Sequence, residues 1–259
     1  MEYITLGYQP IPFLKITRKI KGEFPSTFGE LKPSQLIAIT GLINERISET
    51  TFLNIMTGIP KFRIKQLDSY ATYKLLTLFE PFTEVKPFHS FIIPKIKTSK
   101  SILFSPKSKL AGITFGQFIF IDSYFASYQA ERNDTDLQKF VASLYLPEHS
   151  DFDESQINYQ DLDAKKVKHE ILDAIVINYV LIKEWLALAY PLIFQSIEED
   201  ETNPTPKKHN DNTNHSAWLK IFDNVVGDDL VNHDRYATLP LHNVFRWMTQ
   251  KIKETMKRK

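Results

Sequence analysis

The chain has 259 residues, 8 glycines and no cysteine, and its 32 basic and 31 acidic residues give a formal charge of +1. The absence of cysteine excludes disulfides, thiolate nucleophiles and cysteine-based zinc sites. The near-neutral charge argues against a nucleic-acid footprint that covers the whole chain, which would be strongly basic. The few, widely spaced glycines contain no phosphate-binding loop of the Walker or dinucleotide type.

The N-terminal part begins as extended chain and then becomes helical. Residues 1–24 predict strands, because apolar and polar residues alternate around Pro10 and Pro12. From Pro33, which suits the first turn of a helix, the apolar spacing becomes helical. Further helices are predicted around 51–56 and 67–79, each ended by a proline-containing segment.

The middle of the chain combines a small β element with apolar helices. Residues 88–106 predict two strands, 91–93 and 102–104, on either side of a Lys-Thr-Ser-Lys turn. Thr114 and Gln117 form the pattern of a capping box, which opens a very apolar helix that ends near residue 130. Asp134 is predicted to cap the next helix, over about 134–145.

A long apolar helix is predicted over about 164–189, after a polar, acidic loop at 147–163. The stretch 171–194 is the segment most similar to a membrane span, but it contains Asp173, Lys183 and Glu184. Each of these charges costs roughly 2.5–3.5 kcal/mol at a bilayer centre. We therefore interpret it as the central, buried helix of the fold and predict no membrane contact.

Residues 196–214 contain one aliphatic side chain, Ile197, and predict a flexible linker, since so little apolar area cannot offset the entropy of ordering. The domain prediction is a helical body at 1–195, this linker, and a helical C-terminal unit at 215–259. The predicted fold is mainly α: an irregular multi-helix bundle around the helix at about 164–189, with small β elements near the N-terminus and around 88–106.

No pattern in the sequence predicts catalytic, cofactor-binding or metal-binding residues. The seven histidines lack the spacing that places two imidazoles on one helix face, and the acidic loop lacks the glycine and terminal glutamate of a calcium-binding EF-hand. Whether the loop at 147–163 binds a cation stays open at this point. Six basic residues in 246–259 fit the C-terminal end of a helix dipole, and they also leave open a contact with nucleic acid or an acidic partner.

The aromatic content, with 19 Phe, 11 Tyr and 3 Trp, exceeds what a compact core requires. Aromatic side chains are enriched at protein interfaces, where one rigid ring covers a large area. We therefore expect partner-binding side chains in the C-terminal unit, namely Trp218, Phe222, Phe245, Trp247 and Met248.

One block of the chain also has a familiar pattern. It covers 112–147 and reads GITFGQFIFIDSYFASYQAERNDTDLQKFVASLYLP. The positions that carry the pattern are Thr114, Phe115, Phe118, Ile119, Phe120, Asp122, Tyr128, Leu137, Leu144, Tyr145 and Pro147. The block resembles a recurrent protein of phages and prophages of Bacteroidetes-type bacteria, although Gln117 and Leu146 depart from that family's usual glutamate and basic residue. The resemblance implies a gene near phage tail or virion genes and no catalytic residues.

We therefore expect a non-enzymatic phage or prophage morphogenesis protein, either a tail assembly factor or a minor virion component, in the host cytoplasm or the virion. Its expected partners are tail or virion proteins or a second copy of the chain, and nucleic acid is not an expected partner. The alternatives are an enzyme whose site is assembled from dispersed Asp, His and Arg residues, and a nucleic-acid-binding accessory protein that uses the basic C-terminal tail.

Overall fold

The computed structural model of the chain describes residues 1–8, 18–156, 159–162, 167–198, 218, 221 and 233–258. These residues are mostly helical, with two small antiparallel sheets. The prediction of a mainly α fold with minor β structure is therefore confirmed. Most of the predicted linker, 199–214, lies outside the described residues.

The N-terminal lobe, which we define as residues 1–82, packs a β-hairpin against short helices. Its strands are β1 (Glu2–Tyr8) and β2 (Arg18–Phe24). Its α-helices are α1 (Pro33–Ile43), α2 (Glu49–Thr57), α3 (Lys61–Ile64) and α4 (Ser69–Thr77), and its 3-10 helices are η1 (Phe28–Glu30) and η2 (Glu80–Phe82).

Aromatic packing holds the hairpin to the helices of this lobe. The two strands pair from Glu2 opposite Phe24 to Tyr8 opposite Arg18, so that alternate side chains face the helices. The ring of Phe79, after α4, makes edge-to-face contacts with Phe24 at 5.9 Å and with Phe52 of α2 at 5.3 Å. The alternation predicted for 1–24 therefore corresponds to one buried face of a hairpin.

The C-terminal lobe, residues 95–258, contains the longer helices. Its strands are β3 (Lys95–Lys97), β4 (Ile102–Phe104) and β5 (Leu146–Pro147), in the order β3-β4-β5. Its α-helices are α5 (Phe115–Glu131), α6 (Asp134–Leu144), α7 (His169–Ala189), α8 (Pro191–Glu198), α10 (His233–Ala237) and α11 (Leu241–Arg258). Its 3-10 helices are η3 (Ser108–Leu110), η4 (Glu154–Gln156) and η5 (Tyr159–Leu162).

The helix α5 begins where the sequence predicts, because the side chain of Thr114 accepts a hydrogen bond from the backbone N–H of Gln117 at 3.1 Å. The Gln117 side chain does not complete the capping box. It donates instead to the carbonyl of Ser143 at 2.9 Å and so joins α5 to α6. The predicted cap of α6 is displaced by one residue, since Asn133 accepts from the N–H of Thr135 at 2.8 Å.

The predicted strand at 91–93 is wrong, and β3 lies at 95–97 instead. Between residues 90 and 93, side chains from other segments bind the backbone. The buried amide of Asn178, on α7, accepts from the N–H of Ile92 at 2.6 Å and donates to the carbonyl of Ser90 at 2.9 Å. The hydroxyl of Tyr145 donates to the carbonyl of Ile93 at 2.6 Å.

The helix α7 is the long helix that the sequence predicts, although it begins at His169; residues 163–166 lie outside the described part of the chain. At the C-terminal end, the first turns of α11 pack on α5 and α8. The N–H of Phe115 donates to the carbonyl of Leu239 at 2.8 Å, and that of Leu241 to the carbonyl of Ile113 at 3.1 Å. The described residues of 215–259 therefore share a core with α5.

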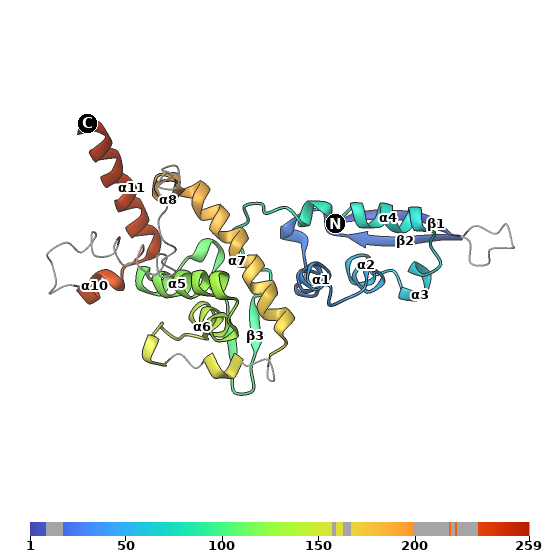
Figure 1. Cartoon of the computed structure of the whole chain (residues 1–259), viewed down its shortest axis with the longest axis horizontal. Helices are drawn as coiled ribbons and strands as arrows, with labels where there is room; N and C mark the ends of the chain where they lie inside the picture. The colour runs from blue at the N-terminus through green and yellow to red at the C-terminus, as the bar shows by residue number, and fades with distance from the viewer. Residues whose placement is uncertain are drawn as a thin grey trace.

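The two lobes lie end to end, with α7 next to the joint between them (Figure 1). The N-terminus lies near this joint, and the last turns of α11 stand out beyond the other helices of the C-terminal lobe (Figure 1). None of the side chains from 249 to 257 is buried. The outer half of α11 is thus a projecting helix end.

Charged side chains from both lobes contact one another at the joint. Arg46, after α1, contacts the carboxylate of Asp173 on α7 at 2.5 Å. The His169 ring bridges two carboxylates, with Nδ1 3.1 Å from Asp173 Oδ2 and Nε2 3.2 Å from Asp134 Oδ1. Only a protonated imidazole donates from both nitrogens, so this geometry favours the charged form of His169.

Burial is the largest single influence on the pKa of His169 and lowers it, but hydrogen bonds and charge from Asp134 and Asp173 together outweigh it and raise the pKa above its usual 6.5. Arg46 opposes this shift. Because the pKa is raised on folding, the stabilisation is complete below the unfolded-state pKa and is lost as the pH rises through the folded-state pKa.

We predict that His169→Gln lowers the free energy of unfolding more at about pH 5.5 than at about pH 8.5, because glutamine cannot carry the charge that the two carboxylates stabilise. Urea unfolding at several pH values measures this difference. The matched control is His149→Gln, since the His149 side chain is 92% exposed. A His169 variant whose loss of stability is equal at both pH values contradicts this account.

Candidate functional site

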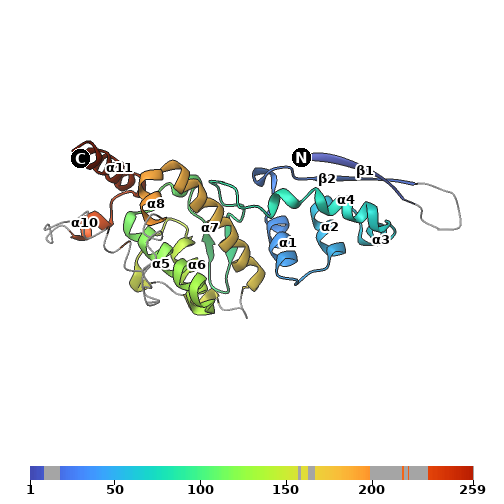
Figure 2. The same cartoon turned by 45° about the horizontal axis from the view of Figure 1, so that its top comes forward.

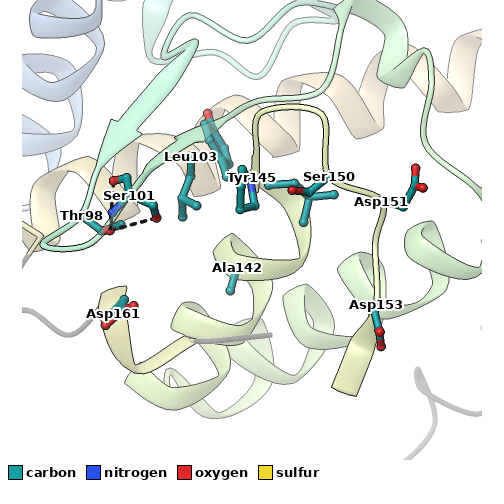
Figure 3. Close-up of a pocket in the computed structure, with 11 residues that line it drawn as sticks. Thr98, Ser101, Leu103, Ala142, Tyr145, Ser150, Asp151, Asp153 and Asp161 are labelled. Carbon is teal, nitrogen blue, oxygen red and sulfur yellow. Dashed lines mark hydrogen bonds between the residues drawn. The ribbon is translucent and has the colours of Figure 1, made fainter. Parts of the chain in front are cut away.

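A cavity lies between the β3–β4 hairpin, the end of α6 and the acidic segment after β5 (Figure 3). Its volume is about 170 Å³. It is lined by Thr98, Ser101, Leu103, Ala142, Tyr145, Leu146, Pro147, Ser150, Asp151, Asp153 and Asp161. Hydroxyl and carboxylate groups therefore make up most of its polar wall.

The hairpin side of this cavity is fixed by its own hydrogen bonds. The hydroxyl of Thr98 accepts from the N–H groups of Lys100 and Ser101, at 3.3 and 3.0 Å, and so closes the turn between β3 and β4. The ring of Tyr145 is buried, and burial raises the pKa of its hydroxyl. Because this hydroxyl already donates to the carbonyl of Ile93, Tyr145 supports the wall and is not an acid or a base at neutral pH.

The carboxylates of the cavity do not converge. Asp161 is buried and lies on the opposite side of the cavity from Asp151 and Asp153 (Figure 3). Its Oδ1 is 3.2 Å from the ammonium of Lys100. Asp153 accepts from the N–H and the hydroxyl of Ser155, at 2.9 and 2.6 Å, which fixes the start of η4. These contacts order the acidic segment, and within the described residues no three His, Asp or Glu side chains gather so as to hold a metal ion.

A second polar cluster has the spacing of a nucleophile and its base. The Nδ1 atom of His89 lies 2.7 Å from the hydroxyl of Ser108 and 2.9 Å from that of Ser90. A serine within hydrogen-bond reach of an imidazole is the first requirement of nucleophilic catalysis. The other nitrogen of this histidine has no carboxylate partner in the part of the chain that the structure describes, so the group that orients the base in a hydrolytic triad is missing there.

The backbone next to this cluster is unusual. Lys109 and Leu110 both adopt left-handed conformations, with φ of 65° and 55°. The turn is held from both sides, since the N–H of Lys109 donates to the carbonyl of His89 at 2.6 Å and its carbonyl lies 2.6 Å from Nε2 of His242 on α11. These contacts stabilise the strained turn, which thereby connects α11 to the segment that precedes β3.

The most heavily buried charge in the C-terminal lobe is Asp122, on α5. Its Oδ2 accepts from the indole N–H of Trp218 at 2.7 Å, and its Oδ1 lies 2.7 Å from the ammonium of Lys183 and 3.2 Å from the hydroxyl of Tyr179, both on α7. Burial, followed by the negative charge of Asp122, raises the pKa of Tyr179 well above its usual value. This network joins α5, α7 and Trp218.

The five predicted partner-binding residues differ in their burial. Trp218, Phe245 and Met248 are buried, and the first two pack on Phe118 of α5 with ring centroids 5.0 and 5.4 Å away. Trp247 is 42% exposed, and Phe222 lies outside the described residues. Three of the five are thus occupied by contacts within the chain.

Sequence reasoning missed the residues that organise the C-terminal lobe and the segment before it, namely His89, Asp122, Asp161 and Lys183. For Asp122 a signal existed, because a single carboxylate in the apolar run Phe-Ile-Phe-Ile-Asp-Ser-Tyr-Phe requires a partner when the helix is buried. His89 and Asp161 gave no such signal, since their partners lie on other segments.

No protein-family model, curated protein or solved structure matches the chain. The described helices include none with the length and apolar character needed to cross a membrane. The assignment of function therefore depends on the geometry described above and on the sequence pattern of 112–147.

We predict that Trp218→Phe destabilises the protein by about 1.5–3 kcal/mol, because it retains the ring but removes the hydrogen bond to a buried carboxylate. Urea unfolding followed by circular dichroism measures the loss. The matched control is Trp247→Phe, which changes the exposed indole of α11 and is expected to stay within about 0.5 kcal/mol of the wild type. Equal effects of the two substitutions contradict a structural role for the Trp218–Asp122 bond.

Proposed function

We propose that this chain is a non-enzymatic morphogenesis protein of a phage or prophage, a tail assembly factor or minor virion component that acts through protein contacts. It would act in the host cytoplasm or within the virion. The main support for a role in protein binding comes from the outer half of α11. It projects from the C-terminal lobe and retains an amphipathic pattern.

The inner and outer halves of α11 differ in what they contact. In the inner half, Leu241, Val244, Phe245 and Met248 are buried against the lobe. In the outer half the same helix face continues with Ile252, which is partly buried against the core, and with Met256, whose side chain is 61% exposed. A helical end with few tertiary contacts is marginally stable in water, so a partner that covers this face would stabilise it.

The phage assignment is supported by the resemblance of 112–147 and by the type of role its residues have. Thr114 caps α5, Phe118 and Tyr145 are core residues, and Asp122 is the buried acceptor described above. The pattern consists of packing and capping residues and includes no group with a catalytic geometry. It gives no support to the enzymatic alternative, for which the described cavity lacks converging acids and bases.

Removal of 250–259 provides the test. The truncated chain retains Trp218, Phe245 and Met248, so its lobe is expected to stay folded. With an affinity-tagged chain produced during prophage induction or infection, we predict that tail or virion proteins co-purify with the full chain and that truncation reduces their recovery by about tenfold or more, since covering one exposed apolar side chain such as Met256 contributes about 1.5–3 kcal/mol. Quantitative mass spectrometry of the eluates measures this recovery.

A matched pair of variants separates the apolar face from helix length and charge. Met256→Ser, which removes an exposed apolar side chain, should reproduce most of the effect of the truncation, whereas Lys257→Ser, on another face of the same turn, should leave recovery nearly unchanged. Equal recovery with the truncated chain would reject the role of α11. Absence of tail and virion proteins from the eluate of the full chain would reject the proposed function itself.

A further inference from the structure

The segment that contains α3 and α4 lies at the end of the N-terminal lobe away from the joint (Figure 2) and exposes an unusual set of side chains. Three large aromatic side chains are exposed there, with exposed fractions of 63% for Phe62, 65% for Tyr70 and 63% for Tyr73. The α4 helix needs none of them for its own packing, because its buried contact is made by Leu75 on the opposite face. These rings therefore remain available on the surface.

Cationic side chains alternate with these rings. They are Lys61, Arg63, Lys65 and Lys74. The Lys74 ammonium lies 4.6 Å from the centre of the Tyr70 ring, and the Arg63 guanidinium lies 5.6 Å from that of Phe62. The carboxylate within 61–74, Asp68, accepts from the N–H of Ala71 at 2.7 Å and caps α4, so it is directed at the helix start. We name the seven residues Lys61, Phe62, Arg63, Lys65, Tyr70, Tyr73 and Lys74 the α3–α4 patch.

Two kinds of macromolecule bind aromatic surfaces, and the cations distinguish them. Protein interfaces are enriched in aromatic residues and arginine but depleted in lysine. Surfaces that bind single-stranded nucleic acid combine aromatic rings, on which bases stack, with lysine and arginine that contact the phosphates. Three of the four cations in the α3–α4 patch are lysines, which favours nucleic acid.

The arrangement on α4 supports the same partner. Tyr70 and Tyr73 are three residues apart and Tyr70 and Lys74 four apart, so the three side chains are neighbours on one helix face. Two rings beside a cation offer stacking positions for adjacent bases and a contact for the phosphate between them. A base-paired duplex cannot use the rings in this way, because its bases are already stacked on one another.

We propose that the α3–α4 patch binds single-stranded nucleic acid without sequence preference. This activity is separate from the contact assigned to α11, and the near-neutral charge of the whole chain is compatible with it, since the positive charge is local.

Fluorescence anisotropy of labelled dT20 and U20 with the full-length protein tests the proposal, with a 20-base-pair duplex for comparison. We expect the single strands to bind more tightly than the duplex at low salt, with an affinity that falls as salt increases. For single strands the slope of log K against log salt is about −0.7 per phosphate contact, so two to four contacts predict a slope between about −1.4 and −2.8.

Substitutions separate stacking from charge. Tyr70→Ala/Tyr73→Ala is expected to weaken binding at least about tenfold without changing the salt slope, because it removes stacking only. Lys61→Gln/Lys65→Gln is expected to make the slope less steep by about 1.4, because it removes two phosphate contacts. All four side chains are exposed, so the thermal stability of these variants should match that of the wild type.

The controls use the same residue types elsewhere. Trp247→Ala removes an exposed ring from α11, and Lys95→Gln/Lys97→Gln removes two exposed lysines from β3. Both should bind as the wild type does. Binding that is absent at low salt, that is unaffected by the patch substitutions, or that is lost instead on removal of 250–259 overturns the proposal. The last two outcomes would leave a nucleic-acid contact elsewhere, and none of the three bears on the recovery of virion proteins.

Discussion

The buried carboxylate of Asp122 constrains the whole C-terminal lobe. An ionised carboxylate without partners is very costly in an apolar interior, so α5 can be buried only if donors reach this position. The donors come from two different places: Lys183 and Tyr179 on α7, and Trp218 from a segment 96 residues further along the chain. The burial of α5, the rotation of α7 about its axis and the return of the chain at Trp218 are therefore coupled.

The same coupling explains an apparent contradiction in the sequence. Lys183 interrupts the most apolar stretch of the chain, where it costs free energy in a membrane and also in a protein core. In this fold its ammonium reaches Asp122 and lies 5.1 Å from the centre of the Phe125 ring. A charge that argues against a membrane span thus becomes the means by which α7 is anchored to α5.

Local features of the fold could be predicted from the sequence, because they depend on residues within a few positions of one another. The spacing of apolar residues placed the main helices, Thr114 marked the start of α5, and alternation indicated the N-terminal hairpin. Contacts between distant segments could not be predicted. The strand before the Lys-Thr-Ser-Lys turn was placed at 91–93 because those residues are apolar. Their backbone groups are instead satisfied by Asn178 and Tyr145, whose positions depend on the complete fold.

Sequence reasoning about sites met the same limit. A buried aromatic residue and an interface residue have the same composition signal, so Trp218 and Phe245 could not be distinguished from Trp247 without the fold. The pairing of His89 with Ser108 likewise joins positions 19 residues apart. It depends on a strained turn at Lys109 and Leu110, and the sequence does not predict this turn because neither position is a glycine.

The fold also separates the two surfaces for which we propose partners. The α3–α4 patch and the outer half of α11 lie at opposite ends of the molecule, with the joint and its side chains Arg46, His169 and Asp173 between them (Figure 1). Because the Arg46 and His169 side chains are 36% and 29% exposed, these ion pairs are partly screened by solvent, and the relative orientation of the lobes depends mainly on the packing of α1 against α7. Partners bound at the two ends would not compete for space. A conformational effect of binding at one end can be transmitted to the other only through this joint.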